Sequence, residues 1–200
     1  MKIICVGRNY AKHAAELNNP VPDEPVIFLK PDTALLLKRQ PFFYPSFSED
    51  VHFEAELVVR IDRVGKNIAE KFAPKYYSQI TLGIDFTARD IQKKLKEKGL
   101  PWEKAKAFDG SAPIGEFIPF KKGDHPAFHL SINGETRQKG DPSDMLFSFD
   151  KLIAHVSQFY TLKLGDLIFT RTPAGVGPIQ IGDHLDGYIG EKKLLDSKIK

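Results

Sequence analysis

The feature that most constrains this chain is the run of residues 53–61, where two glutamates stand two positions apart among strand-forming residues. Successive side chains of a strand point to opposite faces, so Glu54 and Glu56 would project from the same face. The alternation ends after Glu56 in the apolar residues 57–59. This pattern predicts a strand that runs from a polar mouth into a buried core.

Two carboxylates on one face need a partner. At a separation of a few ångströms they repel, and each pKa would rise unless a positive charge lay between them. A hard divalent metal ion held by oxygen ligands would supply that charge. The ordinary alternative is that Glu54 and Glu56 form the solvent face of an amphipathic strand, and a bare Glu-x-Glu pattern leaves that alternative open.

A third acid follows in the chain. Residues 80–86 form an apolar strand whose only charge, Asp85, falls near its end. Thr87 is the expected cap of a helix that runs to about Lys98 and stops at Gly99. Asp85 at the end of a strand would complete a three-carboxylate site with the two glutamates, although it could instead be a second capping residue.

Length and charge exclude several classes of protein. A chain of 200 residues favours one domain, residues 1–200, with a sizeable core. The net charge of +3 comes from 29 basic and 26 acidic residues that are interleaved along the chain, which argues against a nucleic-acid partner. The apolar run 3–6 is too short for a signal sequence, and no segment is long enough to span a membrane.

A single cysteine, Cys5, excludes both an intrachain disulfide and a cysteine-based zinc site. We therefore expect a reducing, cytoplasmic environment.

Further strands and helices are predicted from apolar periodicity. We expect strands at 2–6, 26–30, 34–38, 128–132 and 167–170, and a helix at 148–160 with Leu152, Ile153, Val156 and Phe159 on its apolar side. Asn133-Gly134 predicts a tight hairpin turn after the strand at 128–132.

A short helix is expected at 10–17, with Asn9 as its N-cap. His13 and Glu16, three residues apart, would share one face of it. A carboxylate beside an imidazole fixes its tautomer and raises its basicity, as a general base requires. A surface histidine–glutamate pair is the alternative.

Two lysines and one loop are candidates for contact with an anion. Lys106 lies in a small, apolar stretch from which it could stabilise an oxyanion, or it is a solvated lysine. Lys30, at the end of an apolar strand, could be a site cation or a surface lysine. In the glycine- and proline-rich loop 171–178, backbone amides and the Thr172 hydroxyl could bind a carboxylate, or the loop is only a turn.

Several blocks in this order resemble the fumarylacetoacetate hydrolase family, and most closely its acylpyruvate hydrolase branch. They cover nearly the whole chain. The blocks are Gly7-Arg8-Asn9-Tyr10-x-x-His13-x-x-Glu16, Phe28-Leu29-Lys30-Pro31, Glu54-x-Glu56, Asp85-x-Thr87-x-Arg89-Asp90-x-Gln92, Lys98-Gly99-Leu100-Pro101-Trp102-x-x-x-Lys106, Asn133-Gly134-Glu135-x-Arg137-Gln138 and Thr172-Pro173-x-Gly175-Val176-Gly177.

The resemblance implies a β-rich α+β fold, with a mixed sheet rolled into a flattened barrel and a few short helices, and a homodimer. It implies Mg²⁺ or Mn²⁺, with Ca²⁺ possible, at the positions of the three acids. It also implies specific roles for other residues. Those roles are catalytic base for His13, its orientation for Glu16, a place near the reacting carbonyl for Lys106, and substrate contact for Arg89, Gln92 and Thr172.

One position departs from the family pattern, which usually has glycine immediately before Thr172. Here the residue is Arg171. Its side chain would either block the approach of the loop or add a second carboxylate-binding group for a longer, fumaryl-type acid.

The chemistry expected from these residues is metal-dependent hydrolysis of a carbon–carbon bond in a 2,4-dioxo acid, such as an acylpyruvate or a fumarylpyruvate-like substrate. Water activated by His13 would attack the 4-carbonyl, and the products would be pyruvate and a carboxylic acid. The alternatives are an oxaloacetate decarboxylase and a tautomerase or isomerase of a 2-hydroxyhepta-2,4-diene-1,7-dioate type. A non-catalytic, metal-stabilised binding protein is the alternative from another class.

Overall fold

The computed structural model describes residues 1–7, 9–10, 22–37 and 40–200 of the chain. The larger of its sheets has six strands in the order β2-β1-β12-β5-β6-β9, in which β1 and β12 are parallel and the other pairs antiparallel. These strands are β1 (Ile3–Gly7), β2 (Val26–Lys30), β5 (Ala55–Ile61), β6 (Tyr77–Ile84), β9 (Ile118–Pro119) and β12 (Leu167–Phe169).

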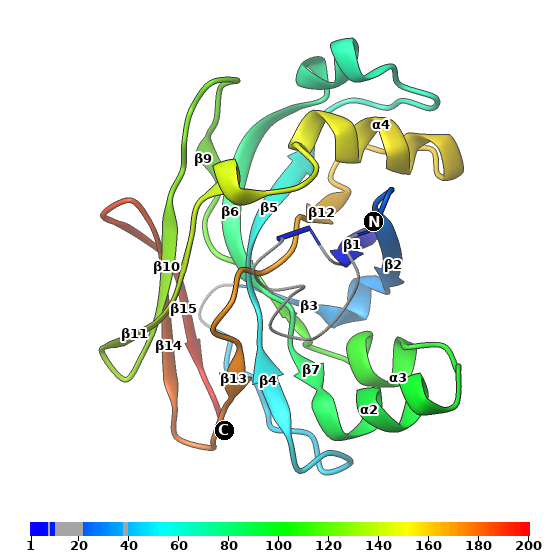
Figure 1. Cartoon of the computed structure of the whole chain (residues 1–200). Helices are drawn as coiled ribbons and strands as arrows, with labels where there is room; N and C mark the ends of the chain where they lie inside the picture. Colours follow the sequence, from blue (N-terminus) through cyan, green and yellow to red (C-terminus); the bar gives the residue numbers. More distant parts are fainter. Residues whose placement is uncertain (8, 11–21, 38–39) are drawn as a thin grey trace.

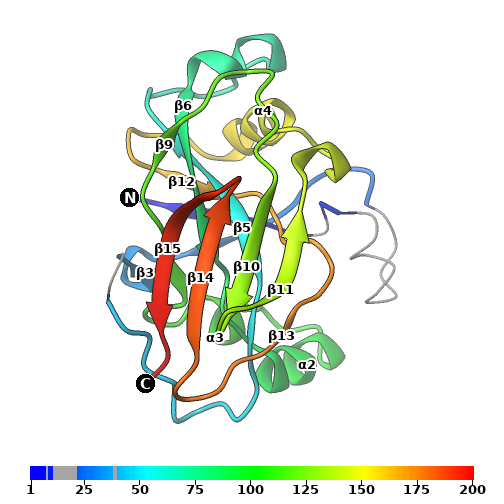
Figure 2. The same ribbon diagram turned by 90° about the vertical axis from the view of Figure 1, so that its left-hand side faces the viewer.

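A second sheet of four strands, in the order β11-β10-β14-β15, lies beside the first (Figures 1 and 2). Its strands are β10 (Phe128–Ile132), β11 (Glu135–Gly140), β14 (His184–Ile189) and β15 (Lys192–Lys198). Leu82 of the first sheet and Leu130, Leu185 and Leu194 of the second belong to one buried apolar cluster. Gly187 permits this close approach, because a Cβ there would lie 2.6 Å from the Leu82 side chain.

Short elements complete the fold. Two small sheets, β13-β4-β7 and β3-β8, lie below the six-stranded sheet, α2 and α3 lie at the lower right in Figure 1, and α4 lies above. Their bounds are β3 (Leu35–Leu36), β4 (Val51–Phe53), β7 (Thr87–Ala88), β8 (Ala112–Pro113), β13 (Gly177–Pro178), α2 (Arg89–Glu97), α3 (Glu103–Lys106) and α4 (Phe149–Phe159), with 3-10 turns η1 (Asp32–Ala34), η2 (Glu70–Lys75) and η3 (Pro142–Asp144). The β-rich α+β fold with few short helices is confirmed.

The strand expected at 53–61 is interrupted at Glu54, which lies between β4 and β5, but β5 alternates as expected. Leu57 and Val59 of β5 belong to the cluster between the two sheets, whereas Val58 belongs to a second buried cluster on the opposite face. Glu56 therefore shares the face of Val58. The Asn133-Gly134 hairpin between β10 and β11 is also confirmed, since both residues adopt positive φ, 53° and 83°.

Several local expectations were wrong. The strand predicted from residue 80 begins at Tyr77, and the one predicted at 34–38 covers only residues 35–36. Phe159, predicted on the apolar side of α4, is 58% exposed, and Ser157 is buried instead because its hydroxyl accepts a hydrogen bond from the Ile68 N–H at 2.8 Å.

Among the described residues, no helix has the length and apolar character needed to cross a bilayer. The predicted helix at 10–17 lies outside the described residues from position 11 onward. Tyr10, its expected first residue, forms a β-bridge with Met145.

Candidate active site

The three acids of the sequence pattern meet where β5 begins and β6 ends. Glu54 precedes β5, Glu56 lies within it and Asp85 follows β6. The Asp85 N–H donates a hydrogen bond to the Glu54 carbonyl oxygen at 2.8 Å, which fixes the two chain segments side by side. One carboxylate oxygen from each acid lies within 4.8 Å of the others, and all three side chains are buried.

This donor set fits a divalent cation. One oxygen of Glu56, Oε1, is buried without a hydrogen-bond partner among the described residues. Burial raises the pKa of Glu56 to about 8, and the negative charge of Asp85 is the second cause of this rise. The cations nearby do not compensate fully for the lost hydration. A cation bound between three carboxylates would satisfy the orphan oxygen and favour the ionised form.

Two lysines are buried against Asp85. The Lys106 ammonium lies 2.6 Å from Asp85 Oδ2 and 3.1 Å from Glu54 Oε2, and Lys30 Nζ lies 2.8 Å from Asp85 Oδ1. Lys30 is therefore a cation of this cluster rather than a surface lysine. Lys106 reaches it from the last position of α3, and Lys30 from the last position of β2.

Thr87 was expected to cap the following helix, and that expectation was wrong. Helix α2 begins at Arg89 with Ala88 in the capping position, and Thr87 lies in β7. Its hydroxyl accepts a hydrogen bond from Lys106 Nζ at 2.6 Å and lies 3.2 Å from Glu54 Oε1, to which it donates. The buried lysine and glutamate are stronger partners for the hydroxyl than a helix N-terminus.

Two arginines complete the cluster, each at a different carboxylate oxygen of Glu54. Arg89 donates from Nη2 to Glu54 Oε1 at 2.7 Å and from Nη1 to Gln92 Oε1 at 2.7 Å. Arg171 donates from Nη1 to Glu54 Oε2 at 2.8 Å, and its backbone N–H donates to Glu56 Oε2 at 2.9 Å. Burial would raise the pKa of Glu54, but Lys106, Arg171 and Arg89 outweigh it and hold that pKa well below its usual range.

The loop before β13 is tied to the strand of the acids by a residue to which sequence reasoning gave no role. The Gln138 side chain accepts a hydrogen bond from the Ala55 N–H at 3.0 Å and donates to Thr172 Oγ1 at 2.9 Å and to the Pro173 carbonyl at 3.1 Å. In the sequence Gln138 is the uncharged residue between Arg137 and Lys139, and in β11 it is buried whereas both neighbours are exposed.

Asn9, the expected helix cap, is buried and hydrogen-bonded elsewhere. It accepts from the Phe147 N–H at 2.7 Å and donates to the carbonyls of Phe147 and Thr170, each at 3.0 Å. His13 and Glu16 lie outside the described residues, so their roles stay predictions.

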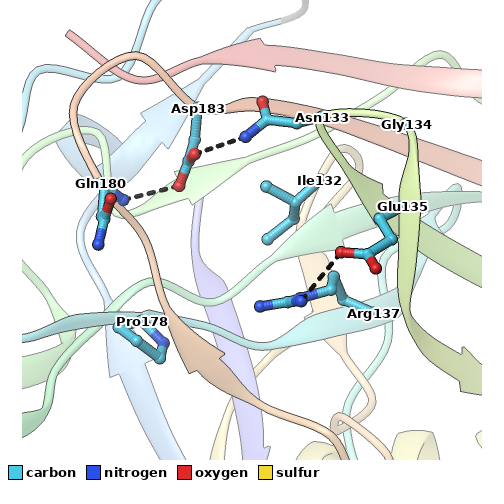
Figure 3. Close-up of a pocket in the computed structure, with 8 residues that line it drawn as sticks. All are labelled: Ile132, Asn133, Gly134, Glu135, Arg137, Pro178, Gln180 and Asp183. Atoms are coloured by element: carbon cyan, nitrogen blue, oxygen red, sulfur yellow. Dashed lines mark hydrogen bonds and ion pairs between the residues drawn. The ribbon is translucent and has the colours of Figure 1, made fainter.

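A hollow of about 560 Å³ between the β10–β11 hairpin and the segment 178–183 is separate from the acids (Figure 3). The lining residues pair with one another: Arg137 Nη1 lies 3.2 Å from Glu135 Oε2, and Asn133 Nδ2 donates to Asp183 Oδ1 at 2.8 Å. The acid cluster is different, because four cations, Lys30, Lys106, Arg89 and Arg171, contact its carboxylates.

Comparisons with known proteins agree on one family. The family model described as fumarylacetoacetate (FAA) hydrolase C-terminal matches residues 2–198. The chain is 48% identical over 202 residues to oxaloacetate tautomerase YcgM of Escherichia coli (strain K12), covering 97% of this chain and 92% of that protein. It is 44% identical over 185 residues to the mitochondrial oxaloacetate decarboxylase of Dictyostelium discoideum, covering 90% and 85%.

The solved structures include a fumarylpyruvate hydrolase from Pseudomonas aeruginosa in complex with Mn²⁺ and pyruvate. It is 36% identical to this chain and superposes with a TM-score of 0.93 over 100% of this chain and 89% of that one.

Proposed function

The chain belongs to the fumarylacetoacetate hydrolase family, and on that premise we propose that it is a divalent-metal-dependent enzyme that interconverts the keto and enol forms of oxaloacetate. The observation that carries this proposal is that oxygens of Glu54, Glu56 and Asp85 lie close together and that one of them, Glu56 Oε1, has no hydrogen-bond partner among the described residues. The choice of substrate is supported by the similarity to an oxaloacetate tautomerase. The reaction expected first from the sequence was hydrolysis of a 2,4-dioxo acid, but these relatives support a reaction of oxaloacetate better.

Tautomerisation moves one proton and one double bond. The C3–H bond of the keto form breaks, a double bond forms between C2 and C3, and the C2 oxygen gains a proton. Mg²⁺ or Mn²⁺ held by Glu54, Glu56 and Asp85 would act as a Lewis acid toward the negative charge at the C2 oxygen.

The residues of the chain would supply the rest. The buried charge of Lys106 favours an enolate nearby, because it acts in a site with little water. We propose His13, oriented by Glu16, as the group that removes the C3 proton and returns it. Arg89, Gln92 and Thr172 are proposed contacts for the carboxylates of the substrate.

The test follows the ultraviolet absorbance of the oxaloacetate enol as it converts to the keto form. We expect Mg²⁺ or Mn²⁺ to be required, and we expect both a chelator and Glu56→Gln to reduce the enzymatic rate by about a hundredfold or more. Glu135→Gln, which changes an exposed glutamate of β11, is the matched control and should keep the wild-type rate. A rate that does not depend on added metal would contradict the proposal.

Hydrolysis of a 2,4-dioxo acid is the second candidate, favoured by the similarity to the fumarylpyruvate hydrolase. Both reactions pass through a stabilised enolate, but hydrolysis also requires a water molecule to attack the 4-carbonyl. Measuring pyruvate release from fumarylpyruvate, acetylpyruvate and oxaloacetate separates hydrolase, decarboxylase and tautomerase. Tight binding of oxalate and Mg²⁺ with no turnover of any of these acids would instead support the non-catalytic binding protein.

We also propose a homodimer, as the resemblance implies. Light scattering of the purified chain, with an expected mass of twice 22.5 kDa, tests it.

A further inference from the structure

Four side-chain groups lie within 3.2 Å of the two carboxylate oxygens of Glu54. An ionised carboxylate accepts about four hydrogen bonds. Arg89 and Thr87 lie 2.7 and 3.2 Å from its Oε1, and Arg171 and Lys106 lie 2.8 and 3.1 Å from its Oε2. Three of these contacts are hydrogen bonds, and the contact of Lys106 is an ion pair. Both oxygens of Glu54 are crowded by cations, so an ion that binds Glu54 has to compete with these partners.

Three of the four partners are held by additional bonds. Arg89 also donates to Gln92 at 2.7 Å, Lys106 also lies 2.6 Å from Asp85, and the Thr87 hydroxyl accepts from Lys106. The Arg171 side chain is held less firmly. Its hydrogen bond to a described residue is the one to Glu54, and its buried Nε has no hydrogen-bond partner within the described ranges.

The backbone of Arg171 has a conformation that suits glycine. Its φ is 97°, which is uncommon and strained for a residue with a Cβ. This conformation lets the Arg171 N–H donate to Glu56 Oε2 at 2.9 Å. A glycine would make the same bond without strain. The side chain over Glu54 is therefore separable from the backbone contact with Glu56.

We propose that the Arg171 guanidinium is an internal counter-cation that occupies Glu54 in the metal-free protein and that a divalent ion must displace. The residue therefore lowers the affinity of the centre for metal, and the site fills only where the divalent ion is abundant. This inference rests on the metal centre of the proposed function.

The test is a calorimetric titration of the full chain, stripped with a chelator and dialysed, with Mn²⁺ alone. Arg171→Gly keeps the N–H bond to Glu56 and removes the competing charge, so its dissociation constant should fall about tenfold or more. The rise in melting temperature on adding a fixed concentration of Mn²⁺ should also be larger in the variant than in the wild type. Arg137→Gly removes the same charge from an exposed position of β11 and should leave the affinity unchanged.

Equal or weaker affinity of Arg171→Gly would overturn the inference while leaving the metal centre intact. Absence of Mn²⁺ binding by both proteins would overturn it together with the proposed metal dependence. If Arg171→Gly does not fold, Arg171→Asn replaces it, because asparagine tolerates positive φ and carries no charge.

Discussion

Lys30 Nζ lies 2.8 Å from Asp85 Oδ1, and both side chains are almost completely shielded from solvent. Lys30 also donates to the carbonyl and hydroxyl oxygens of Ser111, at 3.0 and 2.9 Å. An edge strand of the six-stranded sheet, β2, is thereby joined to the acid cluster.

Removing this lysine should destabilise the protein. Lys30→Met would leave Asp85 buried without one of its two cations, and breaking a buried ion pair in this way costs about 3–5 kcal/mol. Urea denaturation measures the change in the free energy of unfolding. Lys66→Met, which alters an exposed lysine that donates to the Gln158 carbonyl, is the control and should cost less than about 0.5 kcal/mol. Comparable losses in both variants would show that the buried pair has no special importance.

Replacing Lys106 should slow turnover strongly but should not prevent metal binding. Lys106→Met removes the buried charge expected to favour the enolate, and loss of such a group lowers kcat by about 10²–10³-fold. The three carboxylates stay, so a Mn²⁺ titration should still show binding. Lys104→Met changes an exposed lysine of the same helix and should behave as the wild type. A Lys106→Met protein with normal kcat would refute the assigned role.

The Gln138 amide should determine the position of the loop that carries Thr172. Gln138→Leu leaves the buried Ala55 N–H without its acceptor, which costs about 1–3 kcal/mol. Because the loop also loses two hydrogen bonds, we expect a higher KM for oxaloacetate than in Lys139→Leu, whose side chain is exposed on the other face of β11. Thermal unfolding and steady-state kinetics measure the two effects, and an unchanged KM would argue against loop positioning by Gln138.

Stability should depend on pH through Asp90, in the first turn of α2. Burial opposes ionisation, but the Ser48 hydroxyl at 2.6 Å and the N–H groups of Ile91 and Glu49 together outweigh it and lower the pKa of Asp90 from 3.8. The folded chain thus binds this proton less tightly than the unfolded chain does, so the stabilisation is complete above 3.8 and is lost as pH falls through the lowered value.

Ser48→Ala should therefore be less stable than the wild type by about 1 kcal/mol at pH 7, with the difference shrinking in acid. Denaturation at several pH values measures it. In an Asp90→Asn background the same substitution should have an effect independent of pH, and a persistent pH dependence there would assign the titration to another group.

The alternation of β5 and the hairpin turn could be predicted from local sequence, whereas the place of Asp85 beside the glutamates was implied by the family resemblance. Alternation in β5 places Glu56 opposite to Leu57, and the Asn133-Gly134 pair specifies its turn through positive φ. These features depend on neighbouring residues alone.

Features that depend on distant partners could not be predicted. Threonine is a common helix cap, yet the Thr87 hydroxyl accepts a hydrogen bond from Lys106 and donates one to Glu54 instead. Lys30 resembles a surface lysine until Asp85 and Ser111 are placed around it. In α2 the most buried residue is Gln92, because it accepts a hydrogen bond from Arg89, whereas Ile91 and Leu95 are only half-buried.

The pairing of β5 with β6 sets Ala55 opposite Ile84 and Glu56 opposite Gly83. A slip of one residue in this ladder would turn Leu57 toward the acids and place Glu56 in the buried apolar cluster between the two sheets. A chain with this altered register would lose both the packing of its apolar core and the acid cluster. Mutations that preserve the packing of β5 therefore preserve the direction in which Glu56 points. The packing that stabilises the fold also fixes the geometry of the acid cluster.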